Sequence, residues 1–218
     1  MTWLGRLYMW ATHRLYDELA WAYDVVSWCV SLGRWSSWRR AALDHLVGRR
    51  ILELGFGTGE LLSEMGERGL EPVGLDASAA MHRVTWRKLA RSGIDIPRVR
   101  GVTQCIPFAN ESFDTAVCTF PAEYILHPAT LYEVARVLRG PDPVSGVGGG
   151  RLVMVGLTIE VDLPFWRRSM GFLFGRQDTS ALERFGHLAH AAGLHVNVVE
   201  MDQGRVRVPV VIAERTLD

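Results

Sequence analysis

The sequence predicts an α/β protein built on a doubly wound, mostly parallel sheet of seven strands that ends in an antiparallel hairpin. Three observations predict it. Short apolar strands alternate with helical segments of 10–15 residues from residue 50 onward, a glycine-rich loop follows the first strand directly, and two strand-like runs close the chain. Such alternation implies right-handed crossovers and a parallel sheet with helices on both faces.

The elements follow from periodicity and from residues that start or end helices. We expect helices over 2–32 and from Ser36 or Ser37 to Leu46, which lie outside the alternation. The predicted strands are 51–54, 72–76, 98–102, 113–119, 151–157, 194–201 and 205–214, and the predicted later helices are 60–68, 78–92, 128–138 and 178–192. The domain prediction is accessory helices over 1–47, a core over 48–218, and a lid-like insertion at 158–177.

Composition excludes several classes of protein. In 218 residues, 24 Lys and Arg balance 24 Asp and Glu, whereas a dedicated nucleic-acid binder usually carries a basic excess. Three cysteines without C-x-x-C spacing predict neither a disulfide framework nor a cysteine-rich metal site, and they favour a reduced cytoplasm. We expect neither a transmembrane helix nor a secretory leader, because no long apolar run and no small-residue cleavage site is present.

The loop Gly55-Phe56-Gly57-Thr58-Gly59 predicts a ligand site. Glycines between a strand and a helix let backbone amides approach a ligand closely. Asp76 ends the next strand, where a carboxylate can accept hydrogen bonds from two ribose hydroxyls. Glu60 replaces the third glycine of the dinucleotide pattern, which disfavours a pyrophosphate ligand. The alternative is a plain turn, with Asp76 capping its helix.

These residues resemble the class I S-adenosylmethionine-dependent methyltransferases over roughly residues 48–157. The first motif of that family matches 53–59, and the second matches Gly74-Leu75-Asp76-Ala77-Ser78 with Met81. Ile106-Pro107-Phe108 and Ser112-Phe113-Asp114 match the stretch before the fourth strand. Glu133 to Leu138, then Gly150-Arg151-Leu152, match the following helix and strand.

The resemblance implies a Rossmann-like fold, S-adenosylmethionine as cofactor and a set of cofactor contacts. The methionine part would lie against the glycine loop and Glu53, the ribose against Asp76, the adenine against Ala77 and Met81, and the sulfonium near Thr119 and Phe120. The full set is Tyr23, Glu53, Gly55, Phe56, Gly57, Gly59, Asp76, Ala77, Met81, Thr103, Gln104, Thr119 and Phe120. Val102 departs from the family, in which an aspartate often reads the adenine amino group, so that Thr103, Gln104 or backbone groups must substitute.

Methyl transfer from a sulfonium needs alignment and exclusion of water, and a catalytic base is optional. The candidates follow the fourth strand, at the carboxyl end of the sheet. We expect Tyr124 to contact the substrate or His127 to accept a proton near neutral pH. The alternative for His127 is a surface residue ahead of Pro128.

Aromatic segments outside the core point to the acceptor. Six of eight tryptophans fall in the first 38 residues, and 163–174 is rich in large apolar groups. Together with nearby arginines they suit a membrane interface, a lid over an apolar acceptor, a homodimer contact or plain core packing. Residues 22–40 also resemble the N-terminal part of quinone and phospholipid methyltransferases. We therefore expect a small, lipophilic acceptor and peripheral membrane contact; a soluble metabolite, a non-catalytic cofactor binder and a nucleotide-dependent oxidoreductase are the alternatives.

Overall fold

The computed structural model describes residues 35–142, 144, 148–157, 160–161, 180–202 and 206–216. The predicted helices of 2–32, Tyr23 and the N-terminal tryptophans up to Trp28 therefore lie outside the described residues. So does the insertion predicted at 158–177, apart from Glu160 and Val161. Within the part described, no helix has the length and apolar character needed to cross a bilayer.

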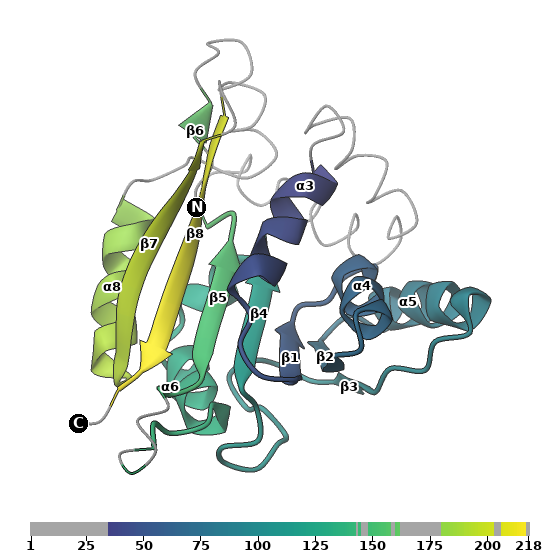
Figure 1. Ribbon diagram of the computed structural model, residues 1–218, viewed down its shortest axis with the longest axis horizontal. Coiled ribbons are helices and arrows are strands. Elements are labelled where there is room, and N and C mark those ends of the chain that lie inside the picture. The colour runs from purple at the N-terminus through teal and green to yellow at the C-terminus, as the bar shows by residue number, and fades with distance from the viewer. Residues whose placement is uncertain are drawn as a thin grey trace, which may run out of the picture.

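One sheet organises the fold, and its strand order confirms the doubly wound prediction (Figure 1). The strands are β1 (Arg50–Leu54), β2 (Glu71–Asp76), β3 (Arg98–Arg100), β4 (Thr115–Thr119), β5 (Arg151–Val155), β6 (Glu160–Val161), β7 (Leu194–Asp202) and β8 (Val206–Arg215). They lie in the order β3-β2-β1-β4-β5-β8, with β7 along β8. The first five are parallel, whereas β8 runs antiparallel to β5 and β7, and the two-residue β6 pairs with β8 further along.

The helices follow the predicted positions with small differences. They are α3 (Trp35–Arg40), η2 (Ala41–His45), α4 (Glu60–Glu67), α5 (Ala79–Ser92), η3 (Glu123–Leu126), α6 (Pro128–Val137) and α8 (Ser180–Ala191). Helix α5 matches its prediction closely, because Ser78 caps its first turn and Gly93 ends it in the left-handed region. The single helix predicted up to Leu46 is instead a short α-helix that tightens into a 3-10 turn.

Three strand predictions were too long. The strand predicted over 151–157 ends at Val155, before Gly156, which has a positive φ of 79°. The strand predicted over 98–102 ends at Arg100, because the chain turns and the Cys105 amide bonds to the Val102 carbonyl. The strand predicted from Phe113 begins at Thr115, and Phe113 forms only an isolated bridge to Leu138. All three errors fall where the chain enters or leaves the sheet.

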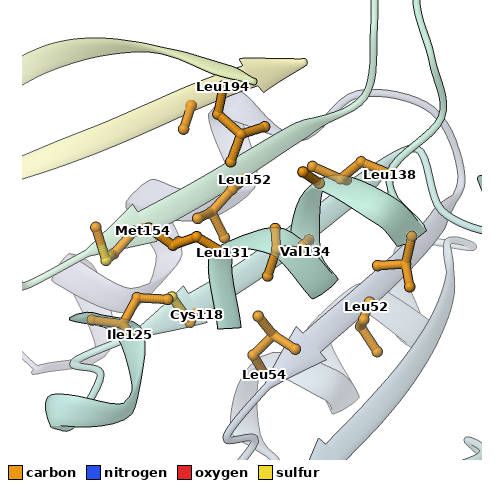
Figure 2. Packing of buried hydrophobic residues seen from close by; sticks show 14 of the residues in the cluster. Leu52, Leu54, Cys118, Ile125, Leu131, Val134, Leu138, Leu152, Met154 and Leu194 are labelled. Carbon is orange, nitrogen blue, oxygen red and sulfur yellow. The ribbon is translucent and has the colours of Figure 1, made fainter. Parts of the chain in front are cut away.

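Alternating residues of the strands build two separate cores. Ile51, Val117 and Val153 face α3, η2, α4 and α5, whereas their neighbours face η3, α6 and α8. Figure 2 shows the second core, in which residues of α6 pack on β1, β4 and β5 (Leu52, Cys118, Leu131, Val134 and Leu152, among others). Burial on both faces is what a doubly wound sheet requires, and it leaves the carboxyl ends of the parallel strands as the edge for a ligand.

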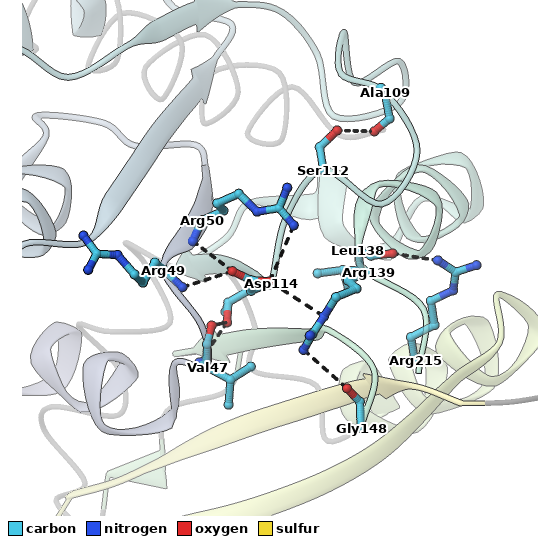
Figure 3. Close-up of polar contacts among 11 residues, drawn as sticks. Val47, Arg49, Arg50, Ala109, Ser112, Asp114, Leu138, Arg139, Gly148 and Arg215 are labelled. Atoms are coloured by element: carbon cyan, nitrogen blue, oxygen red, sulfur yellow. Dashed lines mark hydrogen bonds and ion pairs between the residues drawn. The ribbon is translucent and has the colours of Figure 1, made fainter. Parts of the chain in front are cut away.

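The opposite end of the sheet is fixed by one carboxylate. Asp114 Oδ2 accepts hydrogen bonds from the backbone amides of Arg49 and Arg50, both at 3.0 Å (Figure 3). Its Oδ1 lies 3.7 Å from the side chains of Arg50 and Arg139. Burial raises the pKa of Asp114, but the two amide bonds and the two guanidinium groups outweigh it and lower the pKa below its usual value. Asp114 thus ties the start of β1 to the start of β4.

Candidate active site

The predicted glycine loop lies between β1 and α4, at the carboxyl end of the sheet. Gly55, Gly57 and Gly59 all have positive φ angles, at 69°, 52° and 75°, which other residues adopt only with strain. A Cβ on Gly59 would lie 2.3 Å from Thr85 Cγ2, whereas one on Gly57 would meet no atom within 4 Å. The loop is therefore closely packed on its α5 side and open at Gly57.

Asp76, at the end of β2, contacts this loop through its carboxylate. Its Oδ2 accepts a hydrogen bond from the Gly57 amide at 2.9 Å, and its Oδ1 accepts one from the Ser78 amide at 2.8 Å. Burial raises the pKa of Asp76, against the lowering effect of these two bonds and of His82. The carboxylate thus joins the glycine loop to the first turn of α5. Both interpretations of the sequence, a ligand site and a plain capped turn, are compatible with this contact.

Residues of α5 support the loop from behind. Thr85 Oγ1 donates to the Gly57 carbonyl at 2.9 Å, and His82 packs edge-on against Phe56 with ring centroids 4.8 Å apart. Phe56 is 4% exposed and belongs to the core, so that any cofactor contact it makes would come from its backbone. Sequence analysis missed His82 and Thr85. The position of Thr85, four residues after Met81 on the buried side of the helix, could have indicated its contact with the loop.

Glu53 is a buried carboxyl directly beneath the loop. It is 2% exposed, and its Oε2 has no hydrogen-bond partner among the residues that the structure describes. Burial raises the pKa of Glu53 to about 8, against the positive charge of Arg39, while the negative charge of Asp76 adds to the rise. An unpaired buried carboxyl oxygen fits a cationic ligand group, which would restore the charged form.

An ion-pair cluster attaches the accessory segment to this site. Glu60, the residue in place of the third glycine, pairs with Arg39 of α3 at 3.4 Å and with Lys88 of α5. Arg40 pairs with Glu64 of α4, also at 3.4 Å. Two ion pairs between neighbouring residues of α3 and acids of α4 therefore hold these two helices together. The sequence identified Glu60 only as an obstacle to dinucleotide binding and did not reveal this second role.

The end of β4 supplies the opposite wall. Phe120 has a positive φ of 50°, and its ring lies 6.3 Å from that of Trp38. Thr119 precedes it as the last residue of β4. A Cβ on Gly156 would lie 2.3 Å from the Phe120 ring, so that glycine after β5 makes room for this side chain. Thr119 and Phe120 thus lie at the predicted edge of the sheet.

Tyr124 reaches the same loop from η3. Its hydroxyl donates to the Leu54 carbonyl at 3.1 Å, and a Cβ on Gly55 would lie 2.7 Å from that hydroxyl. The phenol therefore covers Gly55 from the side opposite α5. This position beside the predicted cofactor loop is compatible with the predicted substrate contact.

His127 has a structural partner that sequence analysis did not identify. Its Nδ1 accepts a hydrogen bond from the Ala129 amide at 3.2 Å and caps α6, and the side chain is exposed. In this arrangement a neutral imidazole carries its proton on Nε2. Accepting a second proton at Nδ1 would break the cap, so that the geometry favours capping over base catalysis.

The residues predicted for the adenine are less closely grouped. Thr103 is 7% exposed, and its hydroxyl pairs with that of Thr130 on α6 at 3.1 Å. Met81 is buried within α5, Ala77 is exposed, and Gln104 is partly exposed. Val102, 51% exposed, leaves this region without a side-chain acceptor at that position. The structure thus brings together the glycine loop, Asp76, Glu53 and Tyr124, whereas Thr103 is engaged elsewhere.

Comparison with known proteins agrees with the geometry. Residues 51–140 match the family model described as a methyltransferase domain. The demethylmenaquinone methyltransferase of Paenarthrobacter aurescens is 32% identical over 156 residues, which cover 70% of this chain and 57% of that protein. That of Thermus thermophilus is 31% identical over 147 residues, which cover 65% and 63%. The chain thus spans less than two thirds of the length of these curated relatives.

A solved structure shows the same fold at low identity. The geranyl diphosphate C-methyltransferase of Streptomyces coelicolor aligns with a TM-score of 0.63 at 15% identity, covering 83% of this chain and 79% of that one. The strand order, the glycine loop with its acidic partner and the family match define a Rossmann-like methyltransferase domain. Residues 51–140 are therefore a methyltransferase domain, and the fold is that of the class I S-adenosylmethionine-dependent methyltransferases.

Proposed function

We propose that this chain transfers a methyl group from S-adenosylmethionine to a small lipophilic acceptor of the quinone or lipid type. One structural observation carries the proposal: the Asp76 carboxylate bonds to the Gly57 amide at the carboxyl edge of the sheet, close to the buried Glu53, whose Oε2 has no hydrogen-bond partner within the described part of the chain. The identity of 31–32% to two demethylmenaquinone methyltransferases supports the acceptor class.

The residues present fit the cofactor. The open side of the loop at Gly57 admits a ligand, and the unpaired oxygen of Glu53 suits the ammonium group of the methionine part. Asp76 would hold the ribose hydroxyls, and Thr119 and Phe120 would border the sulfonium. When bound, the cofactor supplies a methyl group activated by a positively charged sulfur. The chain's own residues orient the reactants and exclude water.

Tyr124 is the proposed acceptor contact. Its ring lies beside Gly55 at the end of β1, and it follows the strand that ends in Thr119 and Phe120. We propose that it lines the path between the cofactor loop and the acceptor. His127, by contrast, would act on the reaction only after giving up the cap of α6.

We also propose that the enzyme works in the cytoplasm in peripheral contact with a membrane, since a lipophilic acceptor partitions into bilayers. The N-terminal tryptophans remain the proposed contact in the first 34 residues, with a homodimer as the alternative partner. The core predicted over 48–218, with its accessory segment over 1–47, remains our proposed domain division.

Transfer of a labelled methyl group tests the proposal. The full chain is incubated with labelled S-adenosylmethionine and a panel of demethylated quinones, phospholipids and soluble metabolites. Label in an extractable quinone or lipid supports it. Label found only in a soluble metabolite would show that the acceptor is not lipophilic. Cofactor binding without transfer to any acceptor would indicate a non-catalytic binder. Binding of NAD in place of S-adenosylmethionine would overturn the cofactor assignment.

A further inference from the structure

The outer face of α5 concentrates positive charge in an otherwise neutral protein. Residues 79–100 contain six Arg and Lys side chains and one acid, a net charge of +5, whereas the whole chain has a net charge of zero. Arg83, Arg87 and Arg91 are exposed, and they make no ion pair among the residues that the structure describes. Their charges are therefore available to a partner.

The geometry of the helix gathers these side chains with an aromatic ring. Arg83, Arg87 and Arg91 are four residues apart, and Trp86 lies between two of them, so that at about 100° per residue all four fall within an arc of roughly 140°. Trp86 is 61% exposed, the largest exposed fraction of any aromatic ring among the described residues. The opposite stripe, with Met81, Thr85 and Leu89, is buried.

A pocket adjoins the tryptophan. It has a volume of about 280 Å³, and its lining combines the apolar Trp86, Leu89 and Ile94 with Arg98 and Asp95. Arg98 and Arg100 belong to β3, the edge strand of the sheet, so that their charges extend the basic face of α5. This recess of mixed polarity offers apolar contact at Trp86, Leu89 and Ile94 beside the positive charge of Arg98, although Asp95 adds one negative charge.

The surface lies at one end of the molecule and connects directly to the site. Figure 1 shows α5 at the β3 edge of the sheet, at the opposite end from α8 and β7. Helix α5 begins at the turn that Asp76 holds through the Ser78 amide. A partner bound along α5 would therefore lie next to the helix that supports the cofactor loop.

We propose that the α5 face, formed by Arg83, Trp86, Arg87 and Arg91 with the adjoining pocket, docks the enzyme on the anionic surface of a lipid bilayer. Arginines that form no ion pair within the described part of the chain attract acidic head groups, and tryptophan, like tyrosine, is enriched at membrane interfaces. A polynucleotide would also attract the arginines, but an exposed tryptophan beside Leu89 and Ile94 favours a lipid surface. The assignment deepens the proposed action on a lipophilic acceptor, on which it rests.

Vesicle binding tests the docking surface in the full chain. Sedimentation with vesicles of phosphatidylcholine alone and with about a third phosphatidylglycerol is expected to show binding only to the anionic vesicles, weakening as salt rises. Arg87→Gln is expected to lower the affinity about fivefold, and the triple change of Arg83, Arg87 and Arg91 to Gln by on the order of a hundredfold. Trp86→Ala is expected to lower it as well.

Matched controls come from the far side of the fold. Arg184 is exposed on α8, and Tyr132 is 54% exposed on α6. Arg184→Gln removes a guanidinium group and Tyr132→Ala removes an exposed aromatic ring elsewhere on the protein. Both are expected to leave vesicle affinity within about twofold, since electrostatic attraction fades beyond a Debye length. Equal losses from Arg87→Gln and Arg184→Gln would overturn the assignment, as would no binding of the unchanged chain to anionic vesicles. Tighter binding to a DNA duplex than to anionic vesicles at the same salt concentration would overturn the lipid assignment and identify the α5 face as a nucleic-acid surface.

The proposed function is measured separately on the same variants. Calorimetry with S-adenosylmethionine and methyl transfer to a detergent-dispersed quinone are expected to be unchanged in the triple variant. If transfer fails in every protein while vesicle binding still depends on Arg87, the proposed function fails and the docking surface stands. If transfer proceeds while vesicle binding is unaffected by the substitutions, only the docking surface fails.

Discussion

Asp76 Oδ2 accepts a hydrogen bond from the Gly57 amide at 2.9 Å, so that the two residues connect the start and the end of the β1-α4-β2 crossover. The bond joins the end of β2 to the loop after β1, and Thr85 holds the carbonyl of the same glycine from α5. The two peptide groups on either side of the Gly57 Cα are thus each held by a side chain. Any ligand bound over Gly57 meets a loop whose shape is already set by the protein.

Asp76→Ala is expected to weaken S-adenosylmethionine binding by about 1–3 kcal/mol, because it removes the ribose acceptor and the partner of the Gly57 amide. Titration calorimetry measures the change. Asp44→Ala is the control, since Asp44 is exposed on η2, away from the loop. Unchanged affinity of Asp76→Ala would remove Asp76 from the cofactor site.

Glu53 predicts an unusual dependence of stability on pH. Its folded-state pKa of about 8 lies above the ordinary value of 4.5, so that between these pH values the folded protein holds a proton that the unfolded chain has released. This group alone therefore lowers the free energy of unfolding as pH rises through that window, by about 1.4 kcal/mol per pH unit. Chemical denaturation of wild type and Glu53→Gln measures it, and the slope is expected to be shallower in Glu53→Gln.

The same residue predicts proton release when the cofactor binds. A ligand ammonium group beside Glu53 favours the charged carboxylate, which lowers its pKa. Near pH 7, calorimetry in buffers of different ionisation enthalpy is expected to detect protons released by wild type in excess of those released by Glu53→Gln. Equal proton release by the two proteins would show that the ammonium group of the ligand does not bind beside Glu53.

Much of the fold was predictable because local and long-range preferences agree. Ser78 and Gly93 mark the ends of α5 in the sequence as in the structure, and the alternation of strands and helices determined the parallel core. The glycine loop and Asp76 were identified for the same reason, since each ends a strand at the carboxyl edge of the sheet.

The remaining site features depend on contacts between segments distant in sequence. Arg39 lies 21 residues from its ion-pair partner Glu60, and the hydroxyl of Tyr124 bonds to Leu54, 70 residues earlier. No periodicity encodes such pairs. The basic face of α5 was missed for another reason, because the net charge of zero averages a local excess with acids elsewhere.

His127 allows a cap and a catalytic base to be distinguished. His127→Ala removes the acceptor for the Ala129 amide and is expected to lower the free energy of unfolding by about 1 kcal/mol. His127→Asn keeps an oxygen acceptor without a titratable ring, so that both stability and methyl transfer are expected to stay close to wild type. A loss of transfer in His127→Asn at wild-type stability would identify the imidazole as the base.

Asp114 is expected to govern the acid stability of the core. Its pKa lies below the usual value because the hydrogen bonds and charges of Arg49, Arg50 and Arg139 outweigh the effect of burial. Its stabilising contribution is therefore complete above the unfolded-state pKa near 3.8 and is lost as pH falls through the lower folded-state pKa. Asp114→Ala leaves two amides without their acceptor and is expected to cost about 1–3 kcal/mol at neutral pH. The cost should shrink in acid, where wild type also loses the charge.

Glu71→Ala is the matched control, because both side chains of its ion pair with Arg49 are exposed. Thermal melts from pH 7 down to pH 3 measure both variants, and a cost of Asp114→Ala that stays constant over this range would show that the charge of Asp114 does not stabilise the fold.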